Sequence, residues 1–278
     1  LESAITFASE VGCKTKESED LKKLADYTLK IRQYLECTEI EKAGNVCNDA
    51  IANNINSEEI TIVSMEYRNK NAVDKITTAL DHGEVNGAIG HLNLSTIQFH
   101  PLQLCLNDGN KISPKTMYLE ELLGTGNRIC KLRELVYKSL WNEVTEMYSK
   151  IDEDFTGMSK CCHTELSKIR SEMLDKNAST VLQSTVSAGS IAGLVGSLNL
   201  KDVEVSGLLV QIKYVESLQE ISELTRKQLE TARQIVNLRQ LVTKDMWEPC
   251  AALVEKTDIA SLAQKEAIVE LENFEVLL

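Results

Sequence analysis

Residues 131–141 read KLRELVYKSLW and residues 237–247 read NLRQLVTKDMW, so one pattern recurs 106 residues further along the chain. The same shift aligns GAIGHLNLSTI, which begins at Gly87, with GLVGSLNLKDV, which begins at Gly193. It matches residues 59–144 with residues 165–250 without a gap. Clustered identities in one register do not arise from composition alone. We therefore interpret this stretch as an internal duplication, which decides the fold class.

A fainter third copy lies at the N-terminus, 101 residues before the second. There Ile31-Arg32-Gln33 aligns with Leu132-Arg133-Glu134 and with Leu238-Arg239-Gln240. At the other end, residues 270–278 resemble the helix opening expected near residue 165. We divide the chain into a partial copy 1 (residues 1–58), copy 2 (59–164) and copy 3 (165–278). We expect the array to continue beyond both ends.

Composition favours helices. The chain is 43% hydrophobic and has only 3 prolines in 278 residues. Long proline-free stretches rich in Leu, Glu, Lys, Ala and Gln are typical of helices. In copy 2 we expect helices over residues 58–70, 71–90, 96–108, 116–137 and 139–152. The sequence predicts an all-α fold, an α-solenoid of stacked antiparallel helical hairpins with a repeat of about 106 residues.

Comparing the copies also predicts where helices begin and break. Copy 2 carries Asn107-Asp108-Gly109-Asn110 followed by Pro114, a turn signal, so we expect a break near residues 213–221 in copy 3. Polar residues recur at positions suited to helix N-caps. The first aligned set is Thr96 and Asp202, and the second is Thr38, Ser139 and Asp245. In the second set, Thr38 with Glu41 and Asp245 with Glu248 fit the capping-box pattern.

Arginine recurs at one register, as Arg32, Arg133 and Arg239. We expect each arginine near a helix C-terminus, where a cation is favoured. Bonding between helices is the favoured role, and a ligand-binding row of arginines is the alternative. Trp141 and Trp247 also align. Because Ile40 occupies the same place in copy 1, we expect a buried core position, with exposed interaction anchors as the alternative.

Glycines recur with the spacing G-x-x-x-G-x-x-G. They are Gly83, Gly87 and Gly90, matched by Gly189, Gly193 and Gly196. A dinucleotide-binding loop would read G-x-G-x-x-G after a strand, and neither feature is present. We interpret the glycines as points where helices approach closely or end.

The net charge of −12 disfavours nucleic acid and anionic membranes as partners and favours proteins with basic surfaces. No window reaches the roughly 20 apolar residues that span a bilayer. We interpret the 8 cysteines mainly as reduced, core-filling side chains of a cytoplasmic protein. The sequons at Asn93 and Asn177 leave a secreted origin open. Cys161-Cys162-His163 lacks the spacing of a metal site, so we expect neither metal nor cofactor.

No catalytic motif is present, so we expect a non-catalytic scaffold that mediates protein–protein interactions. At L-R-[EQ]-L-V-x-K-x-x-W the chain resembles helical-repeat segments of very large cytoskeletal or ciliary proteins of single-celled eukaryotes. That resemblance implies an architectural role on the cytoskeleton or cilium. Two alternatives stay open. A spectrin-like array requires helices of about 30 residues and is opposed by lengths of 12 to 22. An all-helical enzyme, such as a terpenoid-synthase-like fold, requires aspartate-rich metal motifs.

Overall fold

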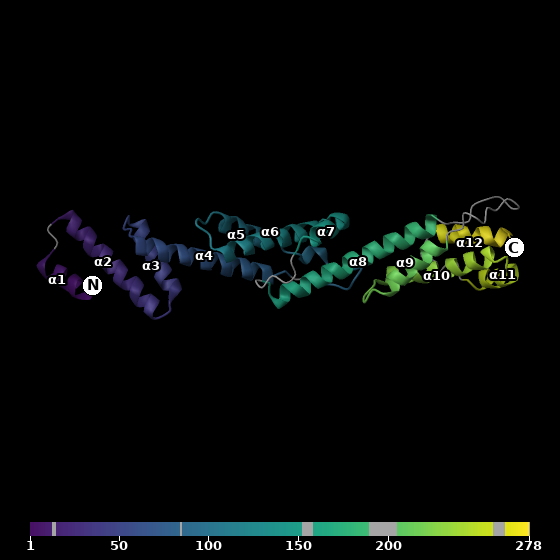
Figure 1. Cartoon of the computed structure of the whole chain (residues 1–278), viewed down its shortest axis with the longest axis horizontal. Helices are drawn as coiled ribbons and strands as arrows, with labels where there is room; N and C mark the ends of the chain where they lie inside the picture. The colour runs from purple at the N-terminus through teal and green to yellow at the C-terminus, as the bar shows by residue number, and fades with distance from the viewer. Residues whose placement is uncertain (13–14, 84, 152–157, 189–204, 258–264, 278) are drawn as a thin grey trace. The chain divides into compact units, whose positions relative to one another are not determined.

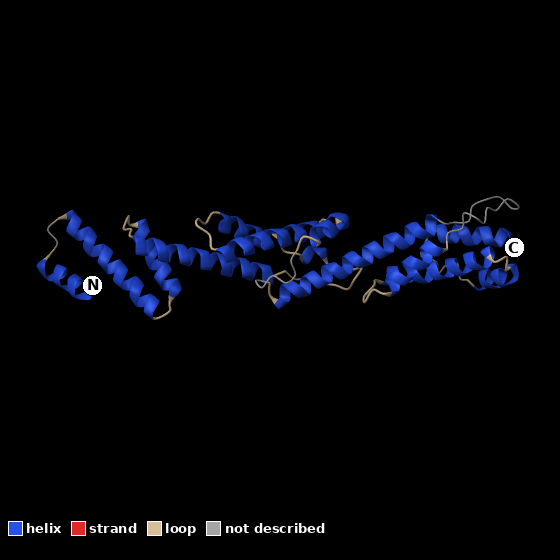
Figure 2. Ribbon diagram, viewed as in Figure 1, coloured by secondary structure: helices blue, strands red, loops and turns tan. Residues whose placement is uncertain are grey.

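The structure, a computed structural model, describes residues 1–12, 15–83, 85–151, 158–188, 205–257 and 265–277. Within these ranges the chain is helical (Figure 1), and the described residues contain no strand (Figure 2). The prediction of an all-α chain is confirmed for this part of the sequence.

The described residues form twelve α-helices in chain order. Their bounds are α1 Glu2–Val11, α2 Lys16–Glu36, α3 Ile40–Ala52, α4 Glu58–Asp81, α5 His100–Asn110, α6 Met117–Tyr137, α7 Trp141–Tyr148, α8 Lys160–Ala188, α9 Ser206–Glu216, α10 Glu223–Thr243, α11 Trp247–Lys256 and α12 Lys265–Leu277. A 3₁₀ turn, η1, covers Leu94–Thr96.

Helix starts recur at the intervals that align the sequence. The 21-residue helices α2, α6 and α10 begin at residues 16, 117 and 223, and α3, α7 and α11 begin at residues 40, 141 and 247. The three 21-residue helices share one kind of start. A hydroxyl one residue before each helix accepts a hydrogen bond from a backbone N–H at 3.2 Å, in the pairs Thr15–Ser18, Thr116–Leu119 and Ser222–Thr225. These are N-caps.

Several predicted helix bounds need correction. The helices expected over 58–70 and 71–90 are one helix, α4, which ends at Asp81. Nothing in its middle breaks a helix, whereas Gly87 and Gly90 beyond its end have φ of 112° and 86°, which an α-helix excludes. The helices expected over 96–108 and 139–152 are α5 and the shorter α7. The prediction for 116–137 is confirmed by α6, and the break expected near 213–221 is confirmed between α9 and α10.

The predicted caps at Thr38, Ser139 and Asp245 are wrong. Their φ values are 59°, 58° and 58°, and the helices that follow have no side-chain cap there. Each residue instead ends the preceding helix in the left-handed conformation. The same two closing hydrogen bonds recur in all three places. They run from Thr38 and Glu39 to Leu35 and Tyr34, from Ser139 and Leu140 to Val136 and Leu135, and from Asp245 and Met246 to Val242 and Leu241.

The other predicted set of N-caps, Thr96 and Asp202, is wrong at Thr96. Thr96 lies at the end of the 3₁₀ turn, and its hydroxyl donates to the Asn93 carbonyl. Helix α5 begins four residues later, after Phe99, without a side-chain cap. Asp202 lies outside the described residues.

The chain forms two compact units. Unit 1 comprises residues 1–82, 98–131 and 151–159, and unit 2 comprises residues 83–97, 132–150 and 160–278. In unit 1 one buried cluster joins α2, α3 and α4, and contains Ile31, Ala43, Cys47, Ala50 and Ile60. Unit 2 has a larger cluster built by α8, α9, α10, α11 and α12. The burial of apolar side chains in these clusters is the main stabilising contribution to the fold.

The predicted burial of the cysteines is confirmed in part. Buried cysteines lie on helices α3, α6, α8 and α11, namely Cys47, Cys130, Cys162 and Cys250. Cys37 and Cys161 are exposed, so the core-filling interpretation is wrong for those two.

Candidate functional site: repeated arginine–glutamate pairs

The three aligned arginines make the same contact. Nε of Arg32, Arg133 and Arg239 donates to a glutamate Oε1 at 2.8 Å, and Nη2 donates to Oε2 of the same carboxylate at 2.7, 2.7 and 2.8 Å. The acceptors are Glu59, Glu165 and Glu270. The expectation that these arginines bond one helix to another is confirmed. Two parallel N–H···O bonds fix both the distance and the orientation of the paired side chains.

The helices place both partners. Each arginine lies in the C-terminal part of a 21-residue helix, α2, α6 or α10. Each glutamate lies near the start of a helix further along the chain, α4, α8 or α12. Glu59 and Glu165 are themselves 106 residues apart, the same interval that separates Arg133 from Arg239. One pair therefore links the same two kinds of helix three times.

Burial distinguishes the three pairs. The side chains of Arg133 and Glu165 are 0% and 1% exposed, and those of Arg239 and Glu270 are both 0% exposed. The side chains of Arg32 and Glu59 are 54% and 35% exposed. Exposed ion pairs contribute about 0–1 kcal/mol, whereas breaking a buried pair by removing one partner costs several kcal/mol.

The buried pairs have further neighbours. Arg239 Nη2 also donates to the carbonyl of Val186, near the end of α8, at 2.7 Å. Gly83 lies against the Arg133–Glu165 pair, where a Cβ atom would overlap the guanidinium and the carboxylate. A side chain at this position would therefore displace part of the ion pair.

Burial also reverses the direction of the glutamate pKa shift. Hydrogen bonding to Arg32 lowers the pKa of Glu59, because the guanidinium favours the carboxylate. Desolvation raises the pKa of Glu165, although the bonds from Arg133 oppose that rise. Arg133 therefore stabilises the Glu165 carboxylate against a larger desolvation cost than Arg32 meets at Glu59.

A second repeated contact was missed in the sequence. The backbone N–H of Thr116 donates to Asn69 Oδ1 at 2.9 Å, and the N–H of Ser222 donates to Asp175 Oδ1 at 2.8 Å. Both acceptors are buried, and both donors precede a 21-residue helix. The sequence did contain a signal for this contact. Asn69 and Asp175 are 106 residues apart, and each is a polar residue within a helix at a position that a neighbouring chain segment covers.

The predicted glycine row lies partly in a loop against α8. Gly90 N–H donates to Glu172 at 2.6 Å, and Lys168 Nζ donates to the Val85 carbonyl at 3.0 Å. A Cβ atom at Gly90 would overlap Ser222, and Gly87 shares the positive φ. Gly83, Gly87 and Gly90 therefore lie in the connection that follows the end of α4, which agrees with a role at a helix end and not with a contact between two helices. Gly193 and Gly196, like Gly189, lie outside the described residues.

The tryptophans are placed differently from the expectation. Trp141 and Trp247 are the first residues of α7 and α11, and both are half-buried, as is Ile40 at the start of α3. The predicted core position is seen in part, because Trp247 packs against the buried cluster of unit 2 while it stays partly exposed. Trp247 Nε1 donates to the exposed Asp245 carboxylate.

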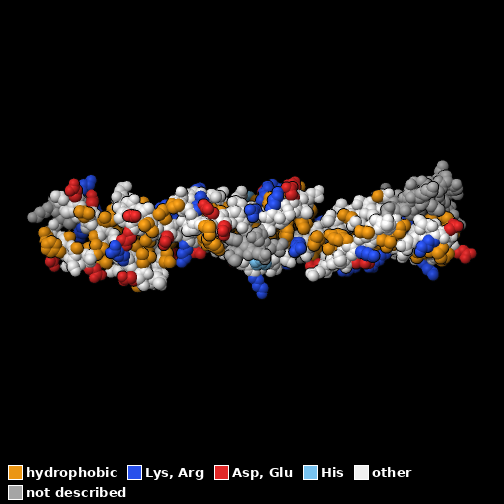
Figure 3. Space-filling model, in the orientation of Figure 1, with side chains coloured by type: hydrophobic (Ala, Val, Ile, Leu, Met, Phe, Trp, Pro, Cys, Tyr) orange, Lys and Arg blue, Asp and Glu red, His pale blue; other side chains and the backbone are white. Residues whose placement is uncertain are grey.

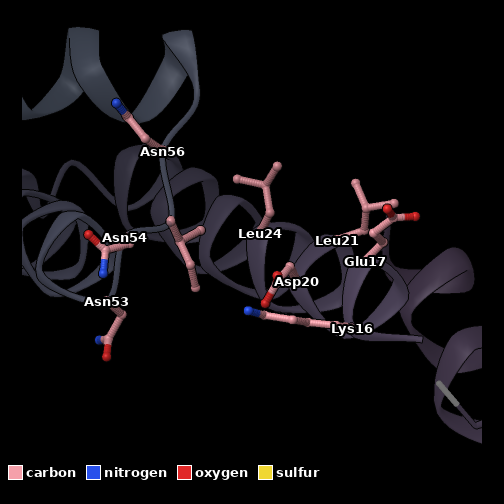
Figure 4. Close-up of a pocket in the computed structure, with 9 residues that line it drawn as sticks. Lys16, Glu17, Asp20, Leu21, Leu24, Asn53, Asn54 and Asn56 are labelled. Carbon is pink, nitrogen blue, oxygen red and sulfur yellow. The ribbon is translucent and has the colours of Figure 1, made fainter. Parts of the chain in front are cut away.

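A cavity of about 540 Å³ lies between the N-terminal half of α2 and the α3–α4 connection. Figure 4 shows Lys16, Asp20, Leu21 and Leu24 on the α2 side, with asparagines across the cavity. Its lining holds neither a nucleophile beside a base nor a convergent set of charges. Among the described residues, His, Cys, Asp and Glu side chains form no group of three that could hold a metal ion.

Comparison with models of protein families, with curated proteins and with solved structures gives no significant match. None of the helices in the described ranges combines the length and apolarity needed to cross a bilayer.

Proposed function

We propose that this chain is a non-catalytic helical-repeat scaffold whose successive copies, each of about 106 residues, stack as an α-solenoid and mediate protein–protein interactions. The observation that carries the proposal is the threefold recurrence of one ion pair between the same two kinds of helix. A repeat that cannot bury its apolar surface alone needs a fixed link to its neighbour, and a bidentate pair supplies that link.

The helix lengths favour this proposal over a spectrin-like array. Such an array needs three long continuous helices per unit. In the described ranges only α8, with 29 residues, approaches that length, and the other helices have 8 to 24 residues. The loop at residues 85–93, which holds Gly87 and Gly90, interrupts copy 2 where a spectrin-like helix would continue.

The net charge of −12 favours partners with basic surfaces. The sequence resemblance at residues 132–141 supports a place in a large cytoskeletal or ciliary protein of the cytoplasm. An architectural role needs no active site.

Deletion of one whole period tests the repeat. Removing residues 59–164 joins residue 58 to residue 165 and places Arg32 opposite Glu165 in the pairing register. We expect this variant to keep its helical circular dichroism per residue and to unfold cooperatively. Removing residues 59–111, half a period, is the control and should abolish cooperative unfolding. Equal loss of structure in both variants would overturn the repeat.

A thermal-shift screen tests the absence of catalysis. The chain is heated with nucleotides and with divalent metals at increasing concentrations. We expect none of these ligands to raise the melting temperature. A ligand that binds only the folded state would raise it progressively, because the stabilisation grows with the logarithm of ligand concentration above Kd. Such a concentration-dependent rise would favour the all-helical enzyme.

A further inference from the structure

The first helix pair of the chain exposes surface that the aligned pairs bury. Helix α5 buries Leu102, Leu106 and Gly109, and α9 buries Leu208, Ile212 and Val215. The aligned residues are Leu1, which directly precedes α1, and Ile5 and Ala8 of α1, and α1 contains no buried residue. Leu1 is 52% exposed, whereas Leu102 and Leu208 are 0% exposed.

Helix α2 shows the same contrast. Of its residues only Ile31 is buried, whereas the aligned helix α10 buries ten. Ala25 of α2 is half-buried, while its counterparts Gly126 and Ala232 are buried. We name the surface formed by Leu1, Ile5, Ala8 and Ala25 the α1–α2 face. Figure 3 shows hydrophobic side chains reaching the surface in this N-terminal region of the chain.

A long helix covers the aligned faces in the rest of the chain. Helix α8 packs against both α9 and α10, and α4 packs against α5. Ile76 of α4 is also one of the closest neighbours of Gly126 on α6. The two covering helices bury the same four positions, 106 residues apart. These are Asn69, Ala72, Ile76 and Leu80 in α4, and Asp175, Ala178, Leu182 and Val186 in α8.

We propose that the α1–α2 face binds an amphipathic helix of the α4 and α8 type. Such a helix carries Asn or Asp, then Ala, then Ile or Leu, then Leu or Val at the spacings of Asp175, Ala178, Leu182 and Val186. This inference rests on the repeat proposed above, because the aligned faces identify the occupant.

The start of α2 provides the matching polar position. The N–H groups of Thr116 and Ser222 donate to the buried Asn or Asp of the covering helix. The aligned N–H of Thr15 donates to Ser18 Oγ at 3.1 Å, within an exposed capping box. On docking, the N–H of Thr15 exchanges its bond to Ser18 Oγ for one to the Asn or Asp of the docked helix, the bond that Thr116 and Ser222 make in the other two copies. A polar contact at one end and apolar contacts along the rest fix the register of the helix.

The test measures binding of a peptide of residues 171–188 to the full chain by fluorescence anisotropy. A staple between two exposed positions holds the peptide helical, because an isolated helix of this length is marginal in water. The control peptide carries glutamate in place of Leu182 and Val186. We expect saturable binding of the first peptide and at least tenfold weaker binding of the second.

Variants of the chain locate the binding surface. Ile5→Glu places a charge on the α1–α2 face, and Ser3→Glu places one on the opposite side of α1, where the aligned Leu104 and Val210 are 66% and 62% exposed. We expect I5E to weaken binding at least tenfold and S3E to leave it unchanged. Ala25→Glu repeats the test on α2, in case I5E detaches α1.

Three results would overturn the inference. The first is that the peptide does not bind the unmodified chain. The second is that I5E, S3E and A25E all bind the peptide as tightly as the unmodified chain, and the third is a homodimer that I5E dissociates while the peptide does not bind. In the last case a second copy of the chain covers the face. If deletion of residues 59–164 preserves the fold but the peptide fails to bind, the inference alone fails and the repeat stands.

Discussion

At the residue scale, the paired arginines predict a large and specific difference between chemically identical substitutions. Arg133→Met leaves the Glu165 carboxylate buried without its partner, which costs about 3–5 kcal/mol of unfolding free energy. Arg32→Met removes an exposed partner and costs less than about 1 kcal/mol. Urea unfolding of both variants measures the difference. The double variant Arg133→Met with Glu165→Leu, which removes both charges, should recover most of the loss; failure to recover would place the cost in packing instead.

The pH dependence of Arg133→Met follows from the raised pKa of Glu165. Because its folded pKa lies above the unfolded value, Glu165 contributes stability at low pH, and this contribution is lost as the pH rises through the folded pKa. Removing Arg133 removes the main group that lowers that pKa. The destabilisation should therefore shrink as the pH falls from 7 toward the ordinary glutamate pKa. A destabilisation that stays constant with pH would show that Glu165 is already protonated.

The stability contribution of Glu59 depends on pH with the opposite sign. Its pKa is lowered by Arg32, so its stabilising contribution is present above the ordinary glutamate pKa and is lost as the pH falls through the lower folded value. This pair is largely exposed, so salt screens it and its contribution is small.

At the element scale, the left-handed helix ends predict a stabilising substitution. Thr38 adopts φ of 59°, a conformation that strains a β-branched residue and suits glycine. Thr38→Gly should raise the free energy of unfolding by roughly 1 kcal/mol. Cys37, the preceding residue, is exposed with φ of −82°, so Cys37→Gly gains nothing and should destabilise. Urea unfolding compares the two, and equal destabilisation by both would contradict the strain at Thr38.

Elements with a periodic apolar pattern could be predicted from sequence, and their ends could not. The spacing of Leu119, Leu122, Ile129 and Leu132 gave α6 within one residue of its observed start. The ends depended on backbone conformation, because a polar residue such as Thr38 can cap the next helix or terminate the previous one. The connection after α4 was expected to be helical because a positive φ at Gly87 or Gly90 leaves no mark in a single sequence.

Only the arginine of each pair in the candidate site could be predicted from the sequence. Aligning the copies singled out Arg32, Arg133 and Arg239 and suggested bonds between helices. Their glutamate partners lie 27, 32 and 31 residues further on, so no fixed spacing identified them. Burial could not be predicted either, because the first pair is exposed and the other two are enclosed by segments distant in sequence.

At the scale of the whole molecule, the proposed array predicts that the chain accepts an additional unit. Inserting a second copy of residues 59–164 after residue 164 preserves the register, because residue 164 then precedes residue 59, the aligned counterpart of residue 165. Each added unit supplies its own long helix and its own ion pair. We expect unchanged helical circular dichroism per residue and a larger dependence of the unfolding free energy on urea, since more surface is exposed on unfolding.

The matched control inserts the same 106 residues after Gly109, within α5, where the register is broken. That variant should lose cooperative unfolding, because the interrupted α5 can no longer pack along α4 and the rest of its own unit is displaced. A closed globular domain would reject both insertions, because its surface is already complete and an added unit finds no neighbour to cover it. Only an array predicts different results for the two insertions, because the same 106 residues keep cooperative unfolding in one register and abolish it in the other.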